Sequence, residues 1–329
     1  MGGRVLRWTY LGIGIAILAL VLFEIDLVRL FTQLKYFGWV SFSIVLGIYL
    51  VAFWLDSISW MLAIEGIRVS WVWTWRTFAA RIAGEAYNAL IPAAGMGGEP
   101  TKAYILKRRF GIDLKASSAS LVIAKTVNMI ALIVFLIAGF LLVQSMNTFP
   151  EALKTMAGLG LTLLVLGTTT LFLLQKLRLT SRLAHYLAKK NQRLWVHRTL
   201  INLDEVDRIF VKFYQDRRTS FICALALAFI NWLLGMIEIY VVMLFLGYPV
   251  DWSVAWVIEA ATQMVRTAAF FIPAAIGVQE GTFLIICGLF TGSPDIGVAA
   301  ALIRRAREII WIIAGLIFAA ILNKTPRPI

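Results

Sequence analysis

Long stretches without a charged residue recur along the chain and set the expectation for its fold. Most are long enough for the roughly 20 residues with which an α-helix crosses about 30 Å of hydrocarbon. Because lipid offers no hydrogen-bond partner to backbone amides and carbonyls, each stretch is predicted to be helical. The stretches are residues 8–23, 38–55, 126–150, 155–175, 219–237 and 309–323. The pattern predicts an all-α polytopic membrane protein with about six full spans.

The first stretch has the position of a secretory signal peptide. It follows Arg4 and Arg7, but Glu24-Ile25-Asp26 comes after it in place of small residues at a cleavage site. We therefore expect it to be retained as an anchor.

Composition supports membrane embedding and narrows the chemistry. Hydrophobic residues make up 60% of the chain and charged residues 15%, and the mean hydropathy is +0.83, outside the range of soluble domains. Cys223 and Cys287 lie in separate apolar stretches, which favours small core residues over a disulfide or a metal site. The chain has no Walker A or zinc motif, and Gly95-Met96-Gly97-Gly98 follows no predicted strand. We expect no metal, nucleotide or other cofactor.

Positive charge is unevenly distributed between the loops and predicts the orientation of the chain. Loops rich in Lys and Arg are cytoplasmic by the positive-inside rule, and tracing the chain from them places both termini in the cytoplasm. The net charge of +13 then reflects topology, and nucleic acid is a poor partner because the basic residues lie beside spans. Basic residues concentrate at 4–7, 68–76, 102–115, 176–218 and 324–327, while loops 24–37, 145–156, 247–253 and 291–296 together carry five acids against three bases.

The loop 176–218 carries eleven Lys or Arg against four acids. Near its end, apolar residues recur at helical spacing and alternate with basic ones, as in a helix lying on lipid headgroups. We expect the loop to attract anionic lipid headgroups, at about 1 kcal/mol per nearby basic residue, or alternatively only to fix topology. The apolar positions are Leu203, Val206, Phe210, Phe213 and Tyr214.

A short motif occurs twice. Residues 91–99 read IPAAGMGGE and residues 272–281 read IPAAIGVQEG, so both copies open with the same four residues and place a Glu seven residues after the Pro. Pro92 and Pro273 break helices, and the glycines that follow permit tight turns. Both segments are therefore predicted to be broken or re-entrant helices.

The two copies are predicted to enter the membrane from opposite faces. Three spans separate them, at about 116–144, 155–175 and 219–247, so the halves form inverted repeats. We divide the single transmembrane domain 1–329 into a first half, 1–175, with the motif 88–104, and a second half, 219–329, with the motif 266–281, joined by the basic loop. Transporters use such repeats to build a central site that opens alternately to each side.

Ionisable residues within the spans support a functional site, because each costs at least about 2.5 kcal/mol at the centre of a membrane helix. Lys125 and Arg304 lie at similar depths from opposite faces, which matches the inverted repeat. Asp56, Arg307 and Glu308 either reach an interface or join the site. We expect a shared polar cavity that holds an anionic headgroup. Its predicted members are Glu99, Lys125, Arg266, Glu280, Arg304 and Arg305, with Arg81 and Glu85 preceding the first motif.

At these motifs the chain resembles the flippase-like transmembrane region of lysylphosphatidylglycerol synthases. The resemblance covers nearly the whole chain. It departs from the family pattern at Ala274-Ala275, where a Gly pair is usual, and at Asn128, where Lys125 commonly has an acidic companion. The matched residues are Asn88, Pro92, Gly98, Glu99, Lys102 and Tyr104 in the first motif and Pro273, Gly277, Glu280 and Gly281 in the second.

The resemblance implies a lipid transporter of the bacterial inner membrane. The residues 270–281 also look like the branch associated with hopanoid biosynthesis, so the lipid is expected to be anionic or isoprenoid, including a hopanoid. The family motif adds Asn88 and Lys102 to the expected substrate site. Glu99 and Glu280 are expected to pair with the cations when the site is empty.

Two other functions remain open. A membrane-embedded transferase acting on a lipid headgroup would use Glu99 or Glu280 as a general base with a pKa raised by burial. A scaffold would hold lipid-synthesis enzymes at the membrane through the basic loop. We expect the protein not to be an enzyme, since the sequence shows no soluble domain for an aminoacyl-transferase site.

Overall fold

The computed structural model describes residues 27–90, 97–177, 204, 207–270 and 272–324, and all regular structure in these ranges is helical. This confirms the all-α prediction. The elements are α2 (Leu27–Ala63), α3 (Trp71–Leu90), α4 (Glu99–Phe110), α5 (Leu114–Ser145), α6 (Glu151–Lys176), η1 (Lys212–Asp216), α9 (Arg218–Phe245), α10 (Trp252–Ala268), η2 (Pro273–Ala275), α11 (Val278–Thr291) and α12 (Pro294–Lys324).

Four stretches of the described helices are long and apolar enough to cross a membrane: Phe31–Ala63, Leu114–Ser145, Glu151–Lys176 and Arg218–Phe245. They contain four of the stretches predicted from the sequence, apart from the last residues of 126–150. The predicted stretch 309–323 lies in α12, which has 31 residues, and 8–23 lies outside the described residues. The chain is a polytopic membrane protein.

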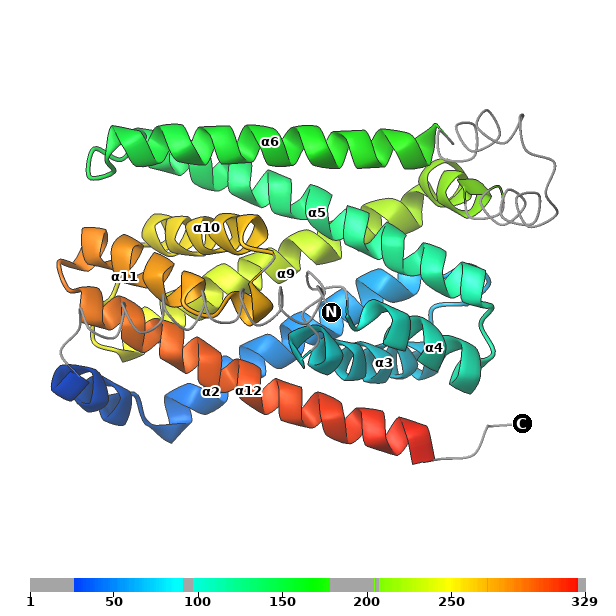
Figure 1. Cartoon of the computed structure of the whole chain (residues 1–329), viewed down its shortest axis with the longest axis horizontal. Coiled ribbons are helices and arrows are strands. Elements are labelled where there is room, and N and C mark those ends of the chain that lie inside the picture. Colours follow the sequence, from blue (N-terminus) through cyan, green and yellow to red (C-terminus); the bar gives the residue numbers. More distant parts are fainter. Residues whose placement is uncertain (1–26, 91–96, 178–203, 205–206, 271, 325–329) are drawn as a thin grey trace, which may run out of the picture.

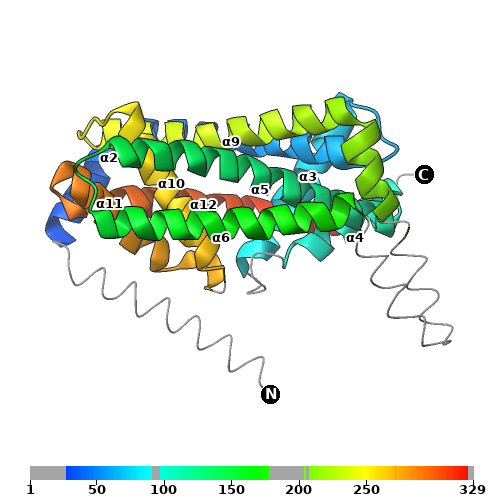
Figure 2. The same ribbon diagram turned by 90° about the horizontal axis from the view of Figure 1, so that it is seen from above.

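The order of elements repeats. A long helix, a half-length helix, a break, a half-length helix and a long helix occur as α2 to α5 and again as α9 to α12. The contacts repeat as well: α3–α4 matches α10–α11, α4–α5 matches α11–α12, and α3–α12 matches α5–α10, while α2 packs against α9. Figure 1 shows α3 and α4 at one end of the bundle and α10 and α11 at the other, and Figure 2 agrees. The two sets are therefore inverted, with α6 outside the repeat.

Close helix crossings occur at equivalent places in the two sets. A Cβ on Gly315 of α12 would overlap the Ile82 carbonyl of α3, and a Cβ on Gly139 of α5 would lie 2.7 Å from that of Ala260 in α10. Membrane helices gain little from apolar burial against each other, so small residues that bring backbones together stabilise the packing.

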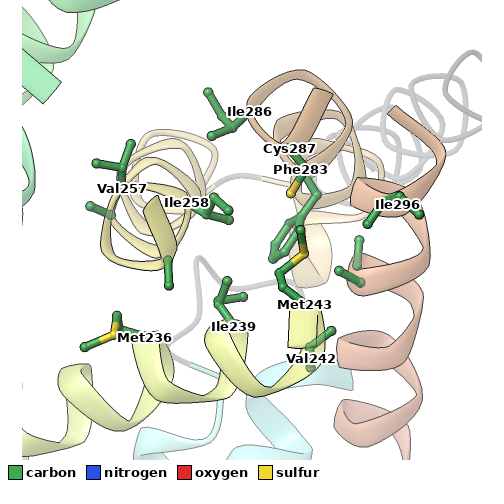
Figure 3. Close-up of a cluster of buried hydrophobic side chains, with 14 of the residues drawn as sticks. Met236, Ile239, Val242, Met243, Val257, Ile258, Phe283, Ile286, Cys287 and Ile296 are labelled. Atoms are coloured by element: carbon green, nitrogen blue, oxygen red, sulfur yellow. The ribbon is translucent and has the colours of Figure 1, made fainter. Parts of the chain in front are cut away.

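The second set also has an apolar core. Figure 3 shows Met243 of α9, Ile258 of α10, Phe283 of α11 and Ile296 of α12 turned toward one another. Each of these side chains is buried, and so is Cys287, whereas Cys223 is exposed on α9. The core holds α11 against α12 and α10, which fixes the second broken segment between them.

The charged loops sort between the two ends of the bundle. Figure 1 places the turn after α2, the turn between α4 and α5, the end of α6, η1 and the end of α12 at one end, which we call the basic end. The turns α5–α6, α9–α10 and α11–α12 lie at the opposite end. This agrees with the sorting expected from the sequence, while the side of the membrane that each end faces stays a prediction.

The described end of the basic loop packs on protein. Phe210, Phe213 and Tyr214 are buried in a cluster with residues of α2, α5 and α9. The Tyr214 hydroxyl lies 2.8 Å from Gln175 Oε1, and Lys212 Nζ lies 2.7 Å from Glu65. These aromatic side chains therefore do not lie on headgroups, because protein already covers them. Leu203 and Val206, and most of the loop, lie outside the described residues.

Candidate functional site

The first break lies between α3 and α4, and Asn88 holds its two sides together. The Gly98 amide donates to Asn88 Oδ1 at 2.6 Å, and Asn88 Nδ2 lies 3.3 Å from Glu85 Oε2. Gly98 has no room for a Cβ, which would overlap the Gly84 carbonyl. Glycine at position 98 thus allows the start of α4 to pack directly on α3. Pro92, the predicted helix breaker, lies outside the described residues.

A charged cluster surrounds this break, and we call it the first cluster. Lys102 Nζ lies 2.9 Å from Glu85 Oε1 and 3.2 Å from Glu99 Oε1, and its side chain is buried. Lys125 of α5 reaches the same Glu99 oxygen at 3.8 Å. Arg81 pairs with the buried Asp56 of α2. Glu99 supplies the acid partner of Lys125 that was not evident from the sequence.

The second break lies between α10 and α11. Gly277 adopts a φ of 79°, and its amide donates to Glu280 Oε2 at 2.8 Å, so Glu280 caps α11. The first helical hydrogen bond runs from the Gly281 amide to the Gly277 carbonyl at 2.9 Å. Pro273 begins the single turn η2. The break therefore lies in the second motif, as the sequence predicted, and the Glu of that motif is the cap.

The second cluster is built around Arg305 of α12. Its guanidinium lies 3.0 and 2.8 Å from Glu280 Oε1, 2.9 Å from the Ala274 carbonyl and 2.8 Å from Glu308. Arg266 of α10 donates to Gln279 at 2.7 Å and to the other oxygen of Glu308 at 3.1 Å. Arg305 thus ties the broken segment and α11 to α12.

Next to the second cluster, four buried charged residues of α9, α10 and α12 form an ionic tetrad: Glu238, Glu259, Arg304 and Arg307. Arg304 lies 2.6 Å from Glu259 and 3.5 Å from Glu238, which also pairs with Arg307. All four side chains are at least 96% buried. Such groups are stable only while each charge is compensated, because water does not solvate them.

A cavity of about 200 Å³ adjoins the tetrad, between α2, α9, α10 and α12. Arg304 Nη1 and Arg307 Nε are buried without a hydrogen-bond partner among the described residues. Both side chains line the cavity, but these two nitrogens are themselves covered by protein. Its polar lining residues include Tyr49, Asn231, Glu238, Glu259, Gln263, Arg266, Arg304 and Arg307.

The predicted site residues divide between these clusters. Arg81, Glu85, Asn88, Glu99, Lys102 and Lys125 lie in the first; Arg266, Glu280 and Arg305 lie in the second, and Arg304 lies in the adjoining tetrad. The sequence interpretation expected one shared cavity. No ion pair joins the first cluster to the others within the described residues. The rings of Phe53 and Tyr49 lie between Arg81 and Arg307, at 5.9 and 3.7 Å from the guanidinium carbons.

The structure adds five charged residues to the predicted site: Glu238 and Glu259, which the sequence did not assign to it, and Asp56, Arg307 and Glu308, for which the sequence left an interface and the site open. All five take part in ion pairs of these clusters. Their signal in the sequence was a charge within or beside an apolar span. With them, acids and bases balance in these ion pairs, with three of each in the first cluster and four of each in the second cluster and the tetrad taken together.

Residues 9–315 match the sequence model of the lysylphosphatidylglycerol synthase TM region. The match includes both broken segments and every residue of the clusters. The chain belongs to this family. Comparisons with curated proteins and with solved structures find no match. Among the described residues, no group of three or more His, Cys, Asp or Glu is arranged to hold a metal ion.

The structure shows why glycine suits the positions of one departure from the family pattern. Ala274 and Ala275 stand where the family usually has a Gly pair, and their φ angles are 50° and 49°. A Cβ makes this left-handed conformation cost roughly 1 to 2 kcal/mol per residue. Glycine suits both positions because the backbone itself requires positive φ there.

Proposed function

We propose that this protein moves a lipid with an anionic headgroup between the two leaflets of a bacterial cytoplasmic membrane. One observation carries the proposal: equivalent places in two inverted halves hold a carboxylate paired with a cation, next to a helix break. Glu99 pairs with Lys125, and Glu280 pairs with Arg305. Inverted repeats around broken helices are typical of transporters with alternating access.

The chemistry of the pairs fits a transient anion site. In the structure, each carboxylate neutralises a cation that would otherwise be costly in the membrane. A phosphate or carboxylate of a lipid headgroup can replace the glutamate on the same N–H donors, so the cation stays compensated throughout. The side chains of Arg304 and Arg307 add positive charge beside the cavity. The lipid tail would remain in the bilayer.

The orientation follows the charge of the loops. The basic end would face the cytoplasm, with both termini there, and the basic residues of loop 176–218 would attract anionic headgroups. Coupling to a lipid gradient or to an ion through the carboxylates would set the direction. A hopanoid or other isoprenoid lipid is the finer expectation from the second motif, and it enters the test as a separate substrate.

The test is leaflet exchange in liposomes that contain the purified protein. Labelled anionic lipids and hopanoids are supplied in separate experiments, and exchange is followed for the native protein, Glu99→Gln and Glu280→Gln. We expect about tenfold slower exchange in each variant, the effect of losing roughly 1.4 kcal/mol at one step. Glu151→Gln is the matched control, because the Glu151 side chain is 85% exposed in its pair with Lys154 at the start of α6.

The outcomes separate the functions. Exchange no faster than in protein-free liposomes for every lipid would refute transport. Formation of a modified lipid from a soluble donor would instead support the transferase. Inactivity in both assays, with co-purification of lipid-synthesis enzymes, would support the scaffold.

A further inference from the structure

The equivalent cations of the two repeats have different surroundings. Lys125 lies eleven residues after the first residue of α5, and Arg305 lies eleven residues after the first residue of α12, so Arg305 corresponds to Lys125, and not Arg304 as the sequence suggested. The Lys125 side chain is 55% exposed and the Arg305 side chain 17%. Their acid partners differ in the same sense, since Glu99 is 16% exposed and Glu280 only 2%. The same position is thus open in one repeat and closed in the other.

The contacts differ as well as the exposure. Among the described residues, Lys125 has Glu99 as its one carboxylate within 4 Å, at 3.8 Å. Arg305 donates to Glu280, to Glu308 and to the Ala274 carbonyl, all within 3.0 Å. The carbonyl contact matters most, because it fastens the backbone of the broken segment to α12. Closure of the second repeat is therefore held by hydrogen bonds and not by apolar packing alone.

The two cations also lie toward different ends of the bundle. At 1.5 Å per residue, each is about 16 Å along its helix from the helix start. α5 starts at the basic end and α12 at the opposite end (Figure 1). Because a lipid-facing ammonium at this depth is unfavourable, the exposed face at Lys125 calls for water or a polar headgroup beside it.

We propose that the structure is the state open toward the basic end, in which Lys125 is the first contact of the anionic headgroup and Arg305 closes the opposite end. In the alternate state the repeats exchange roles: Lys125 closes on Glu99, and Arg305 releases Ala274 and Glu280. The ligand class rests on the proposed function. The sidedness of access does not, since it follows from the asymmetry of the repeats.

Sided thiol labelling tests this directly. The chain has two cysteines, so Cys223→Ala with Cys287→Ala gives a cysteine-free background. Single reporters are Lys125→Cys and Ala274→Cys, the second keeping the carbonyl that Arg305 binds. The full-length protein is placed in phosphatidylcholine vesicles and sorted by orientation through a tag after α12. A membrane-impermeant trimethylammonium thiosulfonate is then added to one side at a time.

We expect Lys125→Cys to react from the basic end at least about tenfold faster than Ala274→Cys reacts from either end. Adding Glu280→Gln, or separately Arg305→Lys, weakens the closed end and should raise labelling of Ala274→Cys from the opposite end by about tenfold. Two gate variants are used so that the test still stands if one of them fails to fold. Glu151→Gln is the control and should change neither rate. Val134→Cys, exposed on the side of α5 opposite Lys125, serves as the lipid-facing reporter and should react slowly.

Equal rates at the two reporters, faster labelling of Lys125→Cys from the opposite end, or no response to both gate variants would overturn the inference. Labelling needs no lipid movement, so its outcome is independent of the exchange assay. If the two reporters react as expected but no lipid exchanges between the leaflets, the sided gate is retained and transport is refuted. If lipid exchanges but the two reporters react at equal rates, transport is retained and the gate is refuted.

Discussion

The tetrad offers a quantitative test of the buried electrostatics, through removal of Glu259. This carboxylate lies 2.6 Å from Arg304 and accepts from Gln263 Nε2 at 2.7 Å. Glu259→Leu keeps a similar volume and leaves Arg304 with Glu238 at 3.5 Å, which already pairs with Arg307. One positive charge then stays uncompensated among buried side chains.

Breaking a buried ion pair in this way costs about 3 to 5 kcal/mol, mostly as desolvation of the remaining charge. Arg304→Met should cost a similar amount, because it leaves two carboxylates facing one guanidinium. The double variant Glu259→Leu/Arg304→Met removes one charge of each sign and leaves the Glu238–Arg307 pair neutral. We therefore expect the double variant to be more stable than either single variant, with a coupling energy of about 2 to 3 kcal/mol.

The free energy of unfolding is measured by reversible denaturation in mixed micelles. The matched control is the Glu151–Lys154 pair, where Glu151→Gln should cost no more than about 1 kcal/mol because the carboxylate is exposed. A loss in the double variant equal to the sum of the losses in the two single variants would refute the reasoning. So would a loss below about 1 kcal/mol in Glu259→Leu, since that would place water around the tetrad.

Three further substitutions test the local geometry by the same measurement. Ala274→Gly combined with Ala275→Gly relieves two positive φ angles and should raise the free energy of unfolding by about 1 kcal/mol, and a loss would show that the strain is absent. Gly98→Ala forces a Cβ into the Gly84 carbonyl and should cost roughly 1 to 3 kcal/mol, whereas Gly167→Ala, which meets nothing within 4 Å, should cost nothing. Tyr214→Phe removes the bond to Gln175 and should cost about 1 kcal/mol; an unchanged value would mean that the hydroxyl does not help to hold the loop.

Hydropathy predicted the long helices because lipid imposes a strong constraint on them. The same reasoning missed α3 and α10, since Arg76, Arg81 and Glu85 interrupt the first and Glu259 and Arg266 the second. These half-length helices were found through the repeated Pro-to-Glu spacing. The inverted order could be predicted from three intervening spans, and the elements follow it.

Partners of the charged residues were harder to predict, because they depend on which helix faces cross. Asp56 and Arg81 pair from α2 and α3, and Glu238 and Arg307 from α9 and α12. The apolar spacing near Tyr214 was read correctly as helical, yet a helix on lipid and a helix on protein have the same periodicity. Burial of Tyr214 follows from its packing with α5 and α9, which the sequence does not specify.

The missing acid beside Lys125 shows how the two repeats reach charge balance by different routes. In α12, Arg305 has Glu308 three residues later, and Glu308 also binds Arg266 of α10. In α5, the residue three positions after Lys125 is Asn128, which carries no charge. The half-length helices differ as well: Glu85 of α3 lies seven residues before Pro92, and the corresponding residue of α10, seven residues before Pro273, is Arg266.

Compared with the second repeat, the first repeat therefore carries this acid on its half-length helix α3 and not on its long helix α5. The position on α3 that corresponds to the cation of α10 is the one that holds the acid. Lys102 compensates Glu85 from α4, so Lys125 shares Glu99 with Lys102 and is held loosely. Arg305 has two carboxylates and is held tightly. Lys125, which shares one carboxylate with Lys102, is better suited to bind an incoming anion. Arg305, which pairs with two carboxylates, is better suited to hold its end of the bundle closed. The departure at Asn128 thus gives the first repeat the properties of an opening site and leaves closure to the second.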